Sequence, residues 1–513
     1  MPTNEKLFIK GREGPDLGLI RERLPVLEDA MRKFASGEFG RAEYKGVSGG
    51  FGTYAQKDPE KHMVRLRLAG GRLTADALSL IVKAVEEHGS DLVHFTTCQT
   101  VQVHNLPAEG ALALVRDALD AGIVTFGGGG DFPRNVTASP LSGIDPGEAF
   151  DVRPFALAAE RYLLGVAPHA NLPRKLKVAF SNGTDDVQAK TRDLGFVARP
   201  DGTFDVYAAG GLGNSGGRHG ALVAEGLDPM YAVYCVEAMV DVFSEHGDRE
   251  SRARARTRFM RDSMGEDGFV AAFKEALSEA QSRGGLGVDS KPSLGTGSGP
   301  EGGWPMTQRD GLYAMRHRPV GGGPAVADLP RYLAVLEGNP GSEIRLGTDR
   351  TVYFVNLPKG AADSVAATLG DAATTPFRGS VACVGGTVCQ VGRADSRGML
   401  LALLESGVED GLAEGALPMI RISGCGSSCA SHQLAPMGFR GATAKGPDGR
   451  VPGYEVHYRV GDSLAELAGT IPETAMAAFV REVGQAASPD RFEDWIKANE
   501  KTFLEIVGRH STG

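Results

Sequence analysis

Alternating apolar and polar residues from position 64 predict the first folded unit of the chain. Residues 64–68 alternate valine and leucine with arginine, which is the period of a strand, and residues 74–88 carry apolar side chains at helical spacing. A second strand is expected over 92–103 and a second helix over 109–121. Following a polar lead-in that is expected to be helical over 17–34, this order predicts a βαβ-type half-domain.

The middle of the chain predicts a larger unit of strands and long helices. A strand is expected over 176–180. Helical spacing of apolar residues predicts helices over 155–164, 230–245, 252–263 and 268–282. The stretch that follows, residues 283–304, is rich in Gly, Ser and Pro and predicts a linker or surface loop.

After this linker the order of motifs starts again. Thr100-Val101 and Asn105-Leu106-Pro107 recur as Thr351-Val352 and Asn356-Leu357-Pro358, at a constant offset of 251 residues. Leu172-Pro173 recurs as Leu417-Pro418, and Gly195-Phe196 as Gly438-Phe439. Several short matches in the same order indicate an internal duplication. A duplicated chain is expected to place a shared site at the interface between its halves.

Length and charge narrow the class of protein. The chain has 513 residues and a net charge of −9, which argues against general nucleic-acid binding. No apolar run approaches the roughly 18 residues that span a bilayer, and residues 1–14 lack the apolar core of a secretory signal. We therefore expect a cytoplasmic protein that binds neither nucleic acid nor membrane.

Four of the six cysteines form two close pairs near the C-terminus. Cys383 and Cys389 are separated by five residues, and Cys425 and Cys429 by three. Paired thiols in a chain without a secretory signal favour a metal centre over disulfides. Thiolates suit zinc or an iron–sulfur cluster, and the wide first gap favours the cluster, because structural zinc pairs are usually closer in sequence. A set of buried structural thiols is the alternative.

The residues around these cysteines resemble a known family. Cys-x5-Cys is followed by Ile-Ser-Gly-Cys-x3-Cys-x2-His-Gln and then by Met437-Gly438-Phe439. This pattern is similar to that of the ferredoxin-dependent nitrite and sulfite reductases, and the resemblance extends over about residues 45–485. It implies a [4Fe-4S] cluster coupled to sirohaem. The cluster ligands would be Cys383, Cys389, Cys425 and Cys429, and Cys429 would bridge the cluster to the sirohaem iron.

The resemblance also implies the fold. The expected class is α+β, internally duplicated, with two ferredoxin-like half-domains and two larger α/β domains around a central sirohaem. The domain limits that follow are a lead-in at 1–55, half-domains at 56–128 and 291–375, a sirohaem-binding domain at 129–290, and a [4Fe-4S]/sirohaem domain at 376–513.

Three basic residues are candidates for binding the substrate. Lys175 and Lys177 lie two apart on an expected strand, so both face the same side and could meet one anion. On residue pattern alone they would be a solvated strand face. In the family the matching Leu-Pro-Arg-Lys-x-Lys segment binds the substrate anion, and the resemblance gives Arg134 a similar role. Lys-x-Lys is more typical of the sulfite reductases than of plant-type nitrite reductases.

Sirohaem carries eight carboxylates, so its pocket must be basic. The run from Arg252 to Arg258 resembles a basic segment that faces these carboxylates in the family, and Arg256 and Arg258 match its core. Arg174 is a further candidate. In a helix, arginines at every second position point in different directions, so about half of this run is expected to face solvent.

Cys98 departs from the family pattern. It stands where the resemblance predicts a second substrate-binding arginine. A neutral thiol cannot replace the bidentate grip of a guanidinium, and the loss of one such contact costs about 1.5–3 kcal/mol of anion affinity. Sulfite therefore becomes less favoured relative to nitrite. Cys98 as a packing residue or a redox thiol is the alternative, whereas Cys235, in an apolar run, is expected in the core.

The expected function is sirohaem-dependent, six-electron reduction of sulfite to sulfide or of nitrite to ammonia. The glycine runs 127–130 and 210–213 do not fit a dinucleotide-binding motif, so electrons are expected from a separate carrier such as ferredoxin. Two alternatives stay open at this point: an enzyme of the same fold acting on a tetrapyrrole precursor, and a non-catalytic iron–sulfur or zinc protein.

Overall fold

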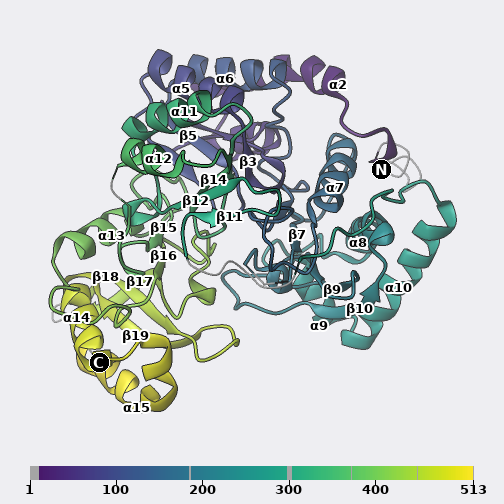
Figure 1. Ribbon diagram of the computed structural model, residues 1–513. Helices are drawn as coiled ribbons and strands as arrows, with labels where there is room; N and C mark the ends of the chain where they lie inside the picture. The colour runs from purple at the N-terminus through teal and green to yellow at the C-terminus, as the bar shows by residue number, and fades with distance from the viewer. Residues whose placement is uncertain (1–10, 184–185, 297–302, 371, 447–448, 512–513) are drawn as a thin grey trace.

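The computed structural model describes residues 11–183, 186–296, 303–370, 372–446 and 449–511. Four sheets with covering helices organise them (Figure 1). The lead-in is helical in α2 (Leu17–Glu22), α3 (Leu24–Ala35) and α4 (Arg41–Ser48), and residues of α3 such as Leu27 pack into the neighbouring core. Among the described residues, no helix is both long and apolar enough to cross a bilayer.

The first half-domain is a four-stranded antiparallel sheet in the order β1-β2-β5-β4. Its strands are β1 (Thr53–Ala55), β2 (His62–Leu66), β4 (Val93–Phe95) and β5 (Val101–Leu106). Helices α5 (Ala75–His88) and α6 (Ala108–Asp120) pack on it, close to the predicted ranges. Thr74 caps α5 through its side chain, and Gly89 ends the helix in the left-handed region, with φ at 64°.

The second half-domain repeats this plan with strands in the order β11-β12-β14-β13-β3. The strands are β11 (Met306–Thr307), β12 (Tyr313–His317), β13 (Glu343–Leu346) and β14 (Val352–Leu357), with β3 (Arg72–Leu73) added at the edge. Helices α11 (Leu329–Gly338) and α12 (Ala362–Leu369) belong to this half-domain, and one apolar core runs through both half-domains. Since β3 belongs to the first half-domain by sequence, the first half-domain contributes a strand to the sheet of the second.

The two larger domains each hold a five-stranded sheet of the same design. The first sheet has the order β10-β9-β8-β7-β6: β6 (Thr137–Ala138), β7 (Val178–Ser181), β8 (Leu194–Ala198), β9 (Phe204–Ala208) and β10 (Ala221–Leu227). The second has the order β15-β16-β17-β18-β19: β15 (Val381–Ala382), β16 (Ile420–Ser423), β17 (Met437–Gly446), β18 (Gly449–Tyr458) and β19 (Glu466–Pro472). In both sheets the first three strands along the chain are parallel and the later pairs antiparallel.

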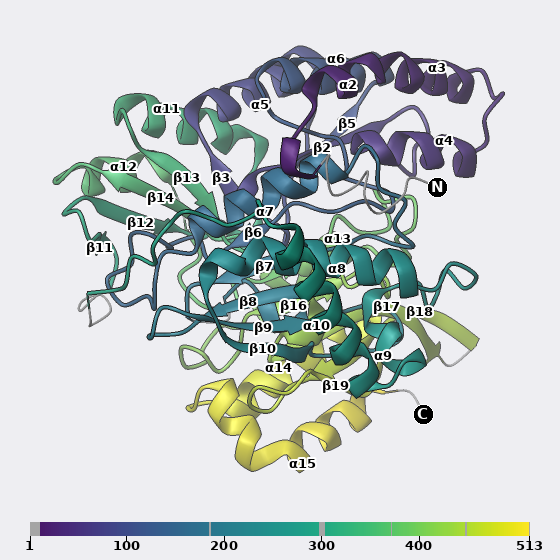
Figure 2. The ribbon, with the colours of Figure 1, turned by 90° about the vertical axis from the view of Figure 1, so that its right-hand side faces the viewer.

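Helices cover these sheets on separate cores (Figure 2). The first domain carries α7 (Arg153–Val166), α8 (Ala232–His246), α9 (Met260–Ser263) and α10 (Glu266–Arg283). The second domain carries α13 (Ser396–Glu405), α14 (Met476–Ala487) and α15 (Phe492–His510). Cys235 is fully buried in α8, as expected of a core residue.

The predicted helix over 252–263 is wrong for residues 252–256, and the rest of the segment is not one continuous α-helix. Only η5 (Thr257–Phe259), a 3-10 turn, and the short α9 are helical there, and residues 252–254 form a turn. Four arginines within seven residues repel one another on a helix, whereas an irregular segment lets each find its own partner. Of the predicted linker, residues 297–302 lie outside the described part of the chain.

The backbone confirms the internal duplication in detail. Gln99 and Arg350 both have positive φ, at 54° and 66°, and they are 251 residues apart in sequence. Asn105 and Asn356 repeat this at 55° and 60°. Left-handed backbone is uncommon outside glycine, so two matched positions are a specific record of common ancestry. The short turns η3 (Ala189–Thr191) and η8 (His432–Leu434) form another such pair, each preceded by a left-handed residue.

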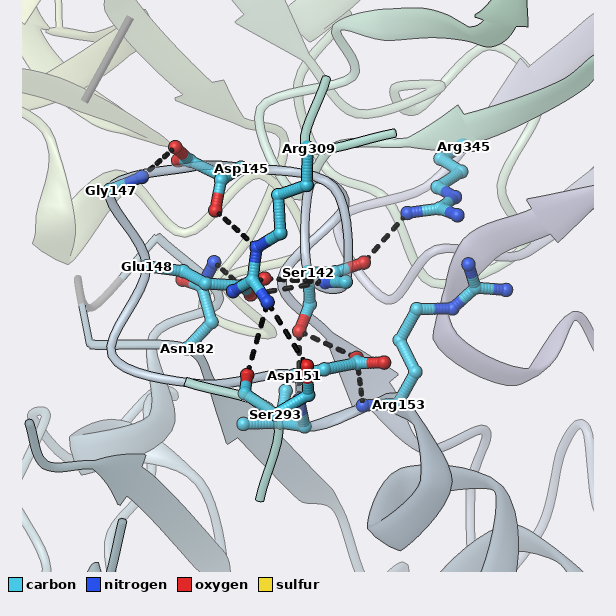
Figure 3. A network of polar contacts seen from close by, with 12 residues as sticks. Ser142, Asp145, Gly147, Glu148, Asp151, Arg153, Asn182, Ser293, Arg309 and Arg345 are labelled. Carbon is cyan, nitrogen blue, oxygen red and sulfur yellow. Dashed lines mark hydrogen bonds and ion pairs between the residues drawn. The ribbon is translucent and has the colours of Figure 1, made fainter. Parts of the chain in front are cut away.

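A polar network joins the first larger domain to the second half-domain (Figure 3). Arg309 donates to the carbonyl of Asp145 at 3.0 Å and to that of Ser293 at 3.1 Å, and it pairs with the buried carboxylate of Glu148. Burial raises the pKa of Glu148 to about 7, although Arg309 opposes the shift. Arg345 donates to the carbonyl of Ser142 at 2.8 Å from the other side. These contacts fix the two halves of the molecule relative to each other.

A buried ion pair makes a similar connection under the first half-domain. Arg67 of the segment after β2 contacts Glu160 of α7 at 2.8 Å, and both side chains are almost fully buried. Glu160 also accepts the N–H of Val136 at 2.8 Å, and Arg67 donates to the carbonyl of Pro133 at 2.9 Å. Replacing Glu160 by alanine should cost about 3–5 kcal/mol, because a buried guanidinium loses its counter-charge.

The measurement is the shift in the denaturation midpoint, followed by circular dichroism. Glu28 provides a matched control, since its pair with Arg116 is exposed on both sides, and Glu28→Ala should cost less than about 1 kcal/mol. Equal losses of stability in the two variants would contradict the prediction that the buried pair contributes more to stability than the exposed one.

Candidate functional site

The two cysteine pairs lie at the carboxyl ends of adjacent parallel strands. Cys383 directly follows β15, and Cys425 comes two residues after β16. The register pairs Ala382 with Ile422, and the N–H of Cys383 donates to the carbonyl of Ile422 at 3.0 Å. Carboxyl ends of neighbouring parallel strands meet at one sheet edge, so the fold brings the two sequence-distant pairs together.

Glycines let the backbone approach the sulfurs closely. The N–H of Gly424 donates to Sγ of Cys383 at 3.2 Å, and the hydroxyl of Ser396 lies 3.1 Å from the same sulfur. A Cβ on Gly424 would stand 2.7 Å from the carbonyl oxygen of Ala394, closer than packed atoms allow. Hydrogen bonds of this kind stabilise thiolate ligands of a metal centre.

The four thiols gather around one region. Burial raises the pKa of Cys429 to about 12, and the thiols of Cys383, Cys425 and Cys389 add to the rise, whereas Lys175 opposes it. Cys429 nevertheless has substantial accessible surface. A side chain that is surrounded by protein and still accessible must face an internal space. We call this space the first hollow.

Four thiols that converge on one region can serve as the ligands of a metal centre. Among the residues that the structure describes, no three His, Cys, Asp or Glu side chains are arranged to share one metal ion. A zinc ion would require its sulfurs at about 2.3 Å from a single centre, whereas a [4Fe-4S] cluster is held by four thiolates at separate corners. The wide gap between Cys383 and Cys389 remains the feature that favours the cluster.

Lys175 and Lys177 lie near the first hollow. They precede β7 and are two residues apart, and both are half-buried although protein surrounds them. Burial lowers the pKa of Lys175 well below its ordinary value, Lys177 and Arg256 lower it further, and Cys429 opposes them. Lys175 therefore lies close enough to Cys429 for each to act on the charge of the other.

Cys98 forms a charged pair with Lys177. Burial alone would raise the pKa of Cys98, but Lys177, Arg192 and Arg65 outweigh it and lower the pKa to about 6. The Cys98 thiolate is the largest single influence on Lys177 and raises its pKa, yet burial and the nearby arginines lower it more. The thiol thus gives up its proton near neutral pH. The sequence predicts a neutral thiol at Cys98, whereas in the structure its lowered pKa brings a negative charge into the site.

Arg134 borders the first hollow, but both of its terminal guanidinium nitrogens donate hydrogen bonds to backbone carbonyls. It donates to the carbonyls of Gly128 and Gly130, the latter at 2.6 Å, and so fixes the glycine run 127–130. Its Nε is buried with no hydrogen-bond partner among the described residues. Burial lowers its pKa to about 10, and neighbouring Arg65 adds to this, so the guanidinium remains charged at neutral pH.

Two arginines of this region escaped the sequence analysis. Arg65 lies between the buried residues Val64 and Leu66 of β2. This alternation shows which face of the strand it occupies but gives no sign of its role. Arg192 is almost fully buried and donates to the carbonyls of Thr97 and Val187. Nothing in the sequence around Arg192 distinguishes it from a surface arginine. Both lie close enough to Cys98 to lower its pKa.

The basic segment 252–258 divides into exposed and buried residues. Arg252 and Arg254 are exposed and pair with Asp131 and Asp262. Arg256 pairs with the buried Asp193 at 2.9 Å, and its Nε is buried with no hydrogen-bond partner in the described chain. Arg258 lies over the Phe259 ring and beside the 210–213 glycine run, at 3.3 Å from a Cβ built on Gly213.

Arg174 has a different environment from Arg256 and Arg258. It is half-buried and pairs with Asp131 at 2.7 Å.

Burial, followed by repulsion from Arg256, lowers the pKa of Arg258 to about 10, so its positive charge is poorly compensated. An excess of cations around the first hollow, with orphaned guanidinium nitrogens, is the environment that a polycarboxylate cofactor such as sirohaem requires.

Comparison with known proteins agrees with this arrangement. Residues 129–281 match the family described as "Nitrite and sulphite reductase 4Fe-4S domain", and residues 54–121 match the "Nitrite/Sulfite reductase ferredoxin-like half domain". The four paired cysteines lie beyond both matched stretches, in the second copy of the duplicated plan.

Two relatives illustrate a similarity that extends over most of the chain. A protein of Mycobacterium tuberculosis named "Sulfite reductase [ferredoxin]" is 29% identical over 442 residues, covering 81% of this chain and 76% of its own length. A "Ferredoxin--nitrite reductase" of Synechococcus elongatus is 27% identical over 422 residues, covering 78% of this chain and 80% of its own. The structure of the M. tuberculosis NirA protein superposes with a TM-score of 0.78 at 24% identity, covering 94% and 95% of the two chains.

The cysteine arrangement predicts the iron content. Changing Cys425 to alanine should remove about four iron atoms per chain, because a [4Fe-4S] cluster needs all four thiolates. Cys235→Ala is the matched control: that thiol is buried in the core of α8, so the variant should keep its iron. Iron is measured by a colorimetric assay on purified protein. Unchanged iron in Cys425→Ala would contradict the cluster assignment.

Proposed function

Because the chain belongs to the nitrite and sulfite reductase family, we propose that it reduces a small oxyanion, nitrite or sulfite, in the first hollow. The observation that carries this proposal is the proximity of Cys429 to the buried ammonium group of Lys175, with Lys177 beside it. Positive charge held away from water binds an oxyanion strongly, since the site is already oriented toward it. The reaction consumes six electrons and several protons.

The residues of this chain fit both cofactors of the family. In our proposal Cys383, Cys389, Cys425 and Cys429 would hold the [4Fe-4S] cluster. Arg256 and Arg258, with Arg174 at the edge, bind sirohaem carboxylates. When bound, these two groups supply the electrons and the open iron position at which the substrate is reduced. The names of the relatives support ferredoxin as the electron donor.

The lysines bind the substrate oxygens and supply protons. A lowered lysine pKa moves its titration from the alkaline range toward neutrality, so the ammonium gives up a proton more readily than an exposed lysine does. Lys175, next to Cys429, is placed to donate to the reacting anion, and Lys177, paired with Cys98, is placed to orient it. Arg134 adds positive charge and holds the glycine run that closes this side of the hollow.

Cys98 bears on the choice between the two substrates. Its thiolate cancels part of the positive charge that Lys177 and Arg192 bring to the hollow. Coulomb energy scales with the product of the charges, so a lower positive potential penalises doubly charged sulfite more than singly charged nitrite. We therefore propose nitrite as the better substrate.

Substituting either lysine tests the anion site apart from the cofactor site. Lys175→Ala and Lys177→Ala should each lower kcat/KM by roughly 10–150-fold, the equivalent of one charge-assisted contact of about 1.5–3 kcal/mol. The absorption spectrum should stay nearly unchanged. Lys445→Ala, on an exposed position of β17, is the control and should keep the activity of the unaltered enzyme. Wild-type kinetics in both lysine variants would refute their substrate-binding role.

Substituting Cys98 tests the substrate preference. Cys98→Arg removes a negative charge and adds a positive one, so kcat/KM should improve more for sulfite than for nitrite. Cys98→Ser is the control of matched size: it removes only the thiolate charge, so its effect should have the same direction and be smaller. Both substrates are assayed with a chemical electron donor at constant cofactor content. An equal change for both substrates would show that Cys98 does not act through charge.

A further inference from the structure

A second polar hollow lies between the two larger domains and the second half-domain. It has a volume of about 680 Å³, which is within the usual range for small-molecule sites. Its walls include the loop 347–349, Lys190 of η3, Arg421 of β16 and Arg459 after β18. None of the residues assigned above to cofactor or substrate binding lines it.

This second hollow is the duplicate of the first. Asp349 stands two residues before Thr351, as Cys98 stands two residues before Thr100 in the matching loop. Asp186 stands three residues before η3, as Cys429 stands three residues before η8. The second hollow is thus built from the same backbone positions as the first. Asp349 stands at the position of Cys98, and Asp186 stands at the position of Cys429.

The cations of the second hollow lack close partners. Within the described part of the chain, Lys190, Arg421 and Arg459 take part in no ion pair, and Nη1 of Arg421 is buried without a hydrogen-bond partner. Asp349 is the nearest acidic influence on Arg421, and burial outweighs it and lowers the pKa of that guanidinium. The Lys190 ammonium has only a ring contact with Tyr207, at 5.6 Å.

The acidic residues of the same walls are already engaged. Asp349 accepts the N–H and hydroxyl of Thr351 and pairs with Arg318 at 3.4 Å. Asp186 accepts the hydroxyl of Ser139 at 2.5 Å. Asp462 is exposed at the rim. Three unpaired cations therefore face a space whose carboxylates are occupied or solvated, which leaves positive potential for a ligand.

We propose that the second hollow is a binding site for a small organic polyanion that bears phosphate or carboxylate groups. Two arginines provide planar donor pairs that match either group, and Lys190 supplies a third charge. The volume admits a ligand larger than nitrite or sulfite. The site has no thiolate at the position of Cys429, so it binds without the redox chemistry of the first hollow.

One residue connects the two hollows. Arg192 donates to the carbonyl of Thr97, in the Cys98 loop, and to that of Val187, between Asp186 and Gln188 of the second hollow. The guanidinium of Arg192 therefore connects the wall of the second hollow to the loop that carries Cys98. The two sites remain separate in composition, so occupation of one should not exclude occupation of the other.

Titration calorimetry on the holoenzyme tests the proposal with citrate and pyrophosphate as probes. At least one of them should bind once per chain, and the stronger one identifies carboxylate or phosphate as the preferred group. Lys190→Gln and Arg459→Gln, made singly, should each weaken binding by roughly tenfold or more, since each removes a charge-assisted contact. Arg450→Gln is the matched control, because Arg450 is exposed at the far end of the strand that Arg459 follows.

Competition distinguishes this site from the first hollow. Saturating nitrite should leave the heat of citrate or pyrophosphate binding unchanged. Displacement by nitrite would place the probes in the first hollow and overturn the proposal. The absence of heat with both probes, or equal affinity in the pocket variants and Arg450→Gln at unchanged absorption spectrum and melting temperature, would overturn it as well.

Discussion

Positive charge kept away from water without full compensation is the constraint on which this structure depends. Burying one unpaired lysine or arginine is costly, and here several converge on a single internal space. Such an arrangement persists only if the surrounding scaffold is rigid and if ligands of opposite charge offset the cost of burying the cations. Oxyanions, cofactor carboxylates and cluster thiolates are ligands of that kind. The same uncompensated positive charge therefore lowers the stability of the apo-protein and raises its affinity for anionic ligands.

The duplicated fold meets this constraint by division of labour. One larger domain contributes lysines at the entry to a parallel strand, and the other contributes thiols at the exits of two parallel strands. Neither contribution is a site alone. The half-domains supply a third wall through the loop 96–100, which Gln99 anchors to the carbonyls of Ala138 and Leu346. Since each wall belongs to a different unit, the packing between units sets the geometry of the site.

Sequence patterns predicted the elements that follow local rules. Strand alternation and helical spacing located the half-domain helices, and repeated dipeptides revealed the duplication that matched left-handed residues confirm. The cysteine spacing predicted a metal centre because ligand chemistry is local. Patterns failed where tertiary contacts decide the outcome. The segment 252–263 has helical composition but its arginines find separate partners, and Arg192 reaches the Cys98 loop only through the carbonyl of Thr97, which is distant in sequence. The charge of Cys98 depends on the same kind of distant neighbours.

The strand β3, which the first half of the chain contributes to the sheet of the second half-domain, has a consequence for biosynthesis. Arg72 of β3 pairs with Arg345 of β13, and it also contacts Glu343, which is 271 residues further along the chain. At ribosomal rates of roughly 5–20 residues per second, β3 waits about 15–55 s for β13, the strand with which it pairs. During this interval an unpaired strand and part of a common core are exposed. The nascent chain is thus a candidate for chaperone binding, and separating the gene between the two copies would leave each product with an incomplete sheet or core.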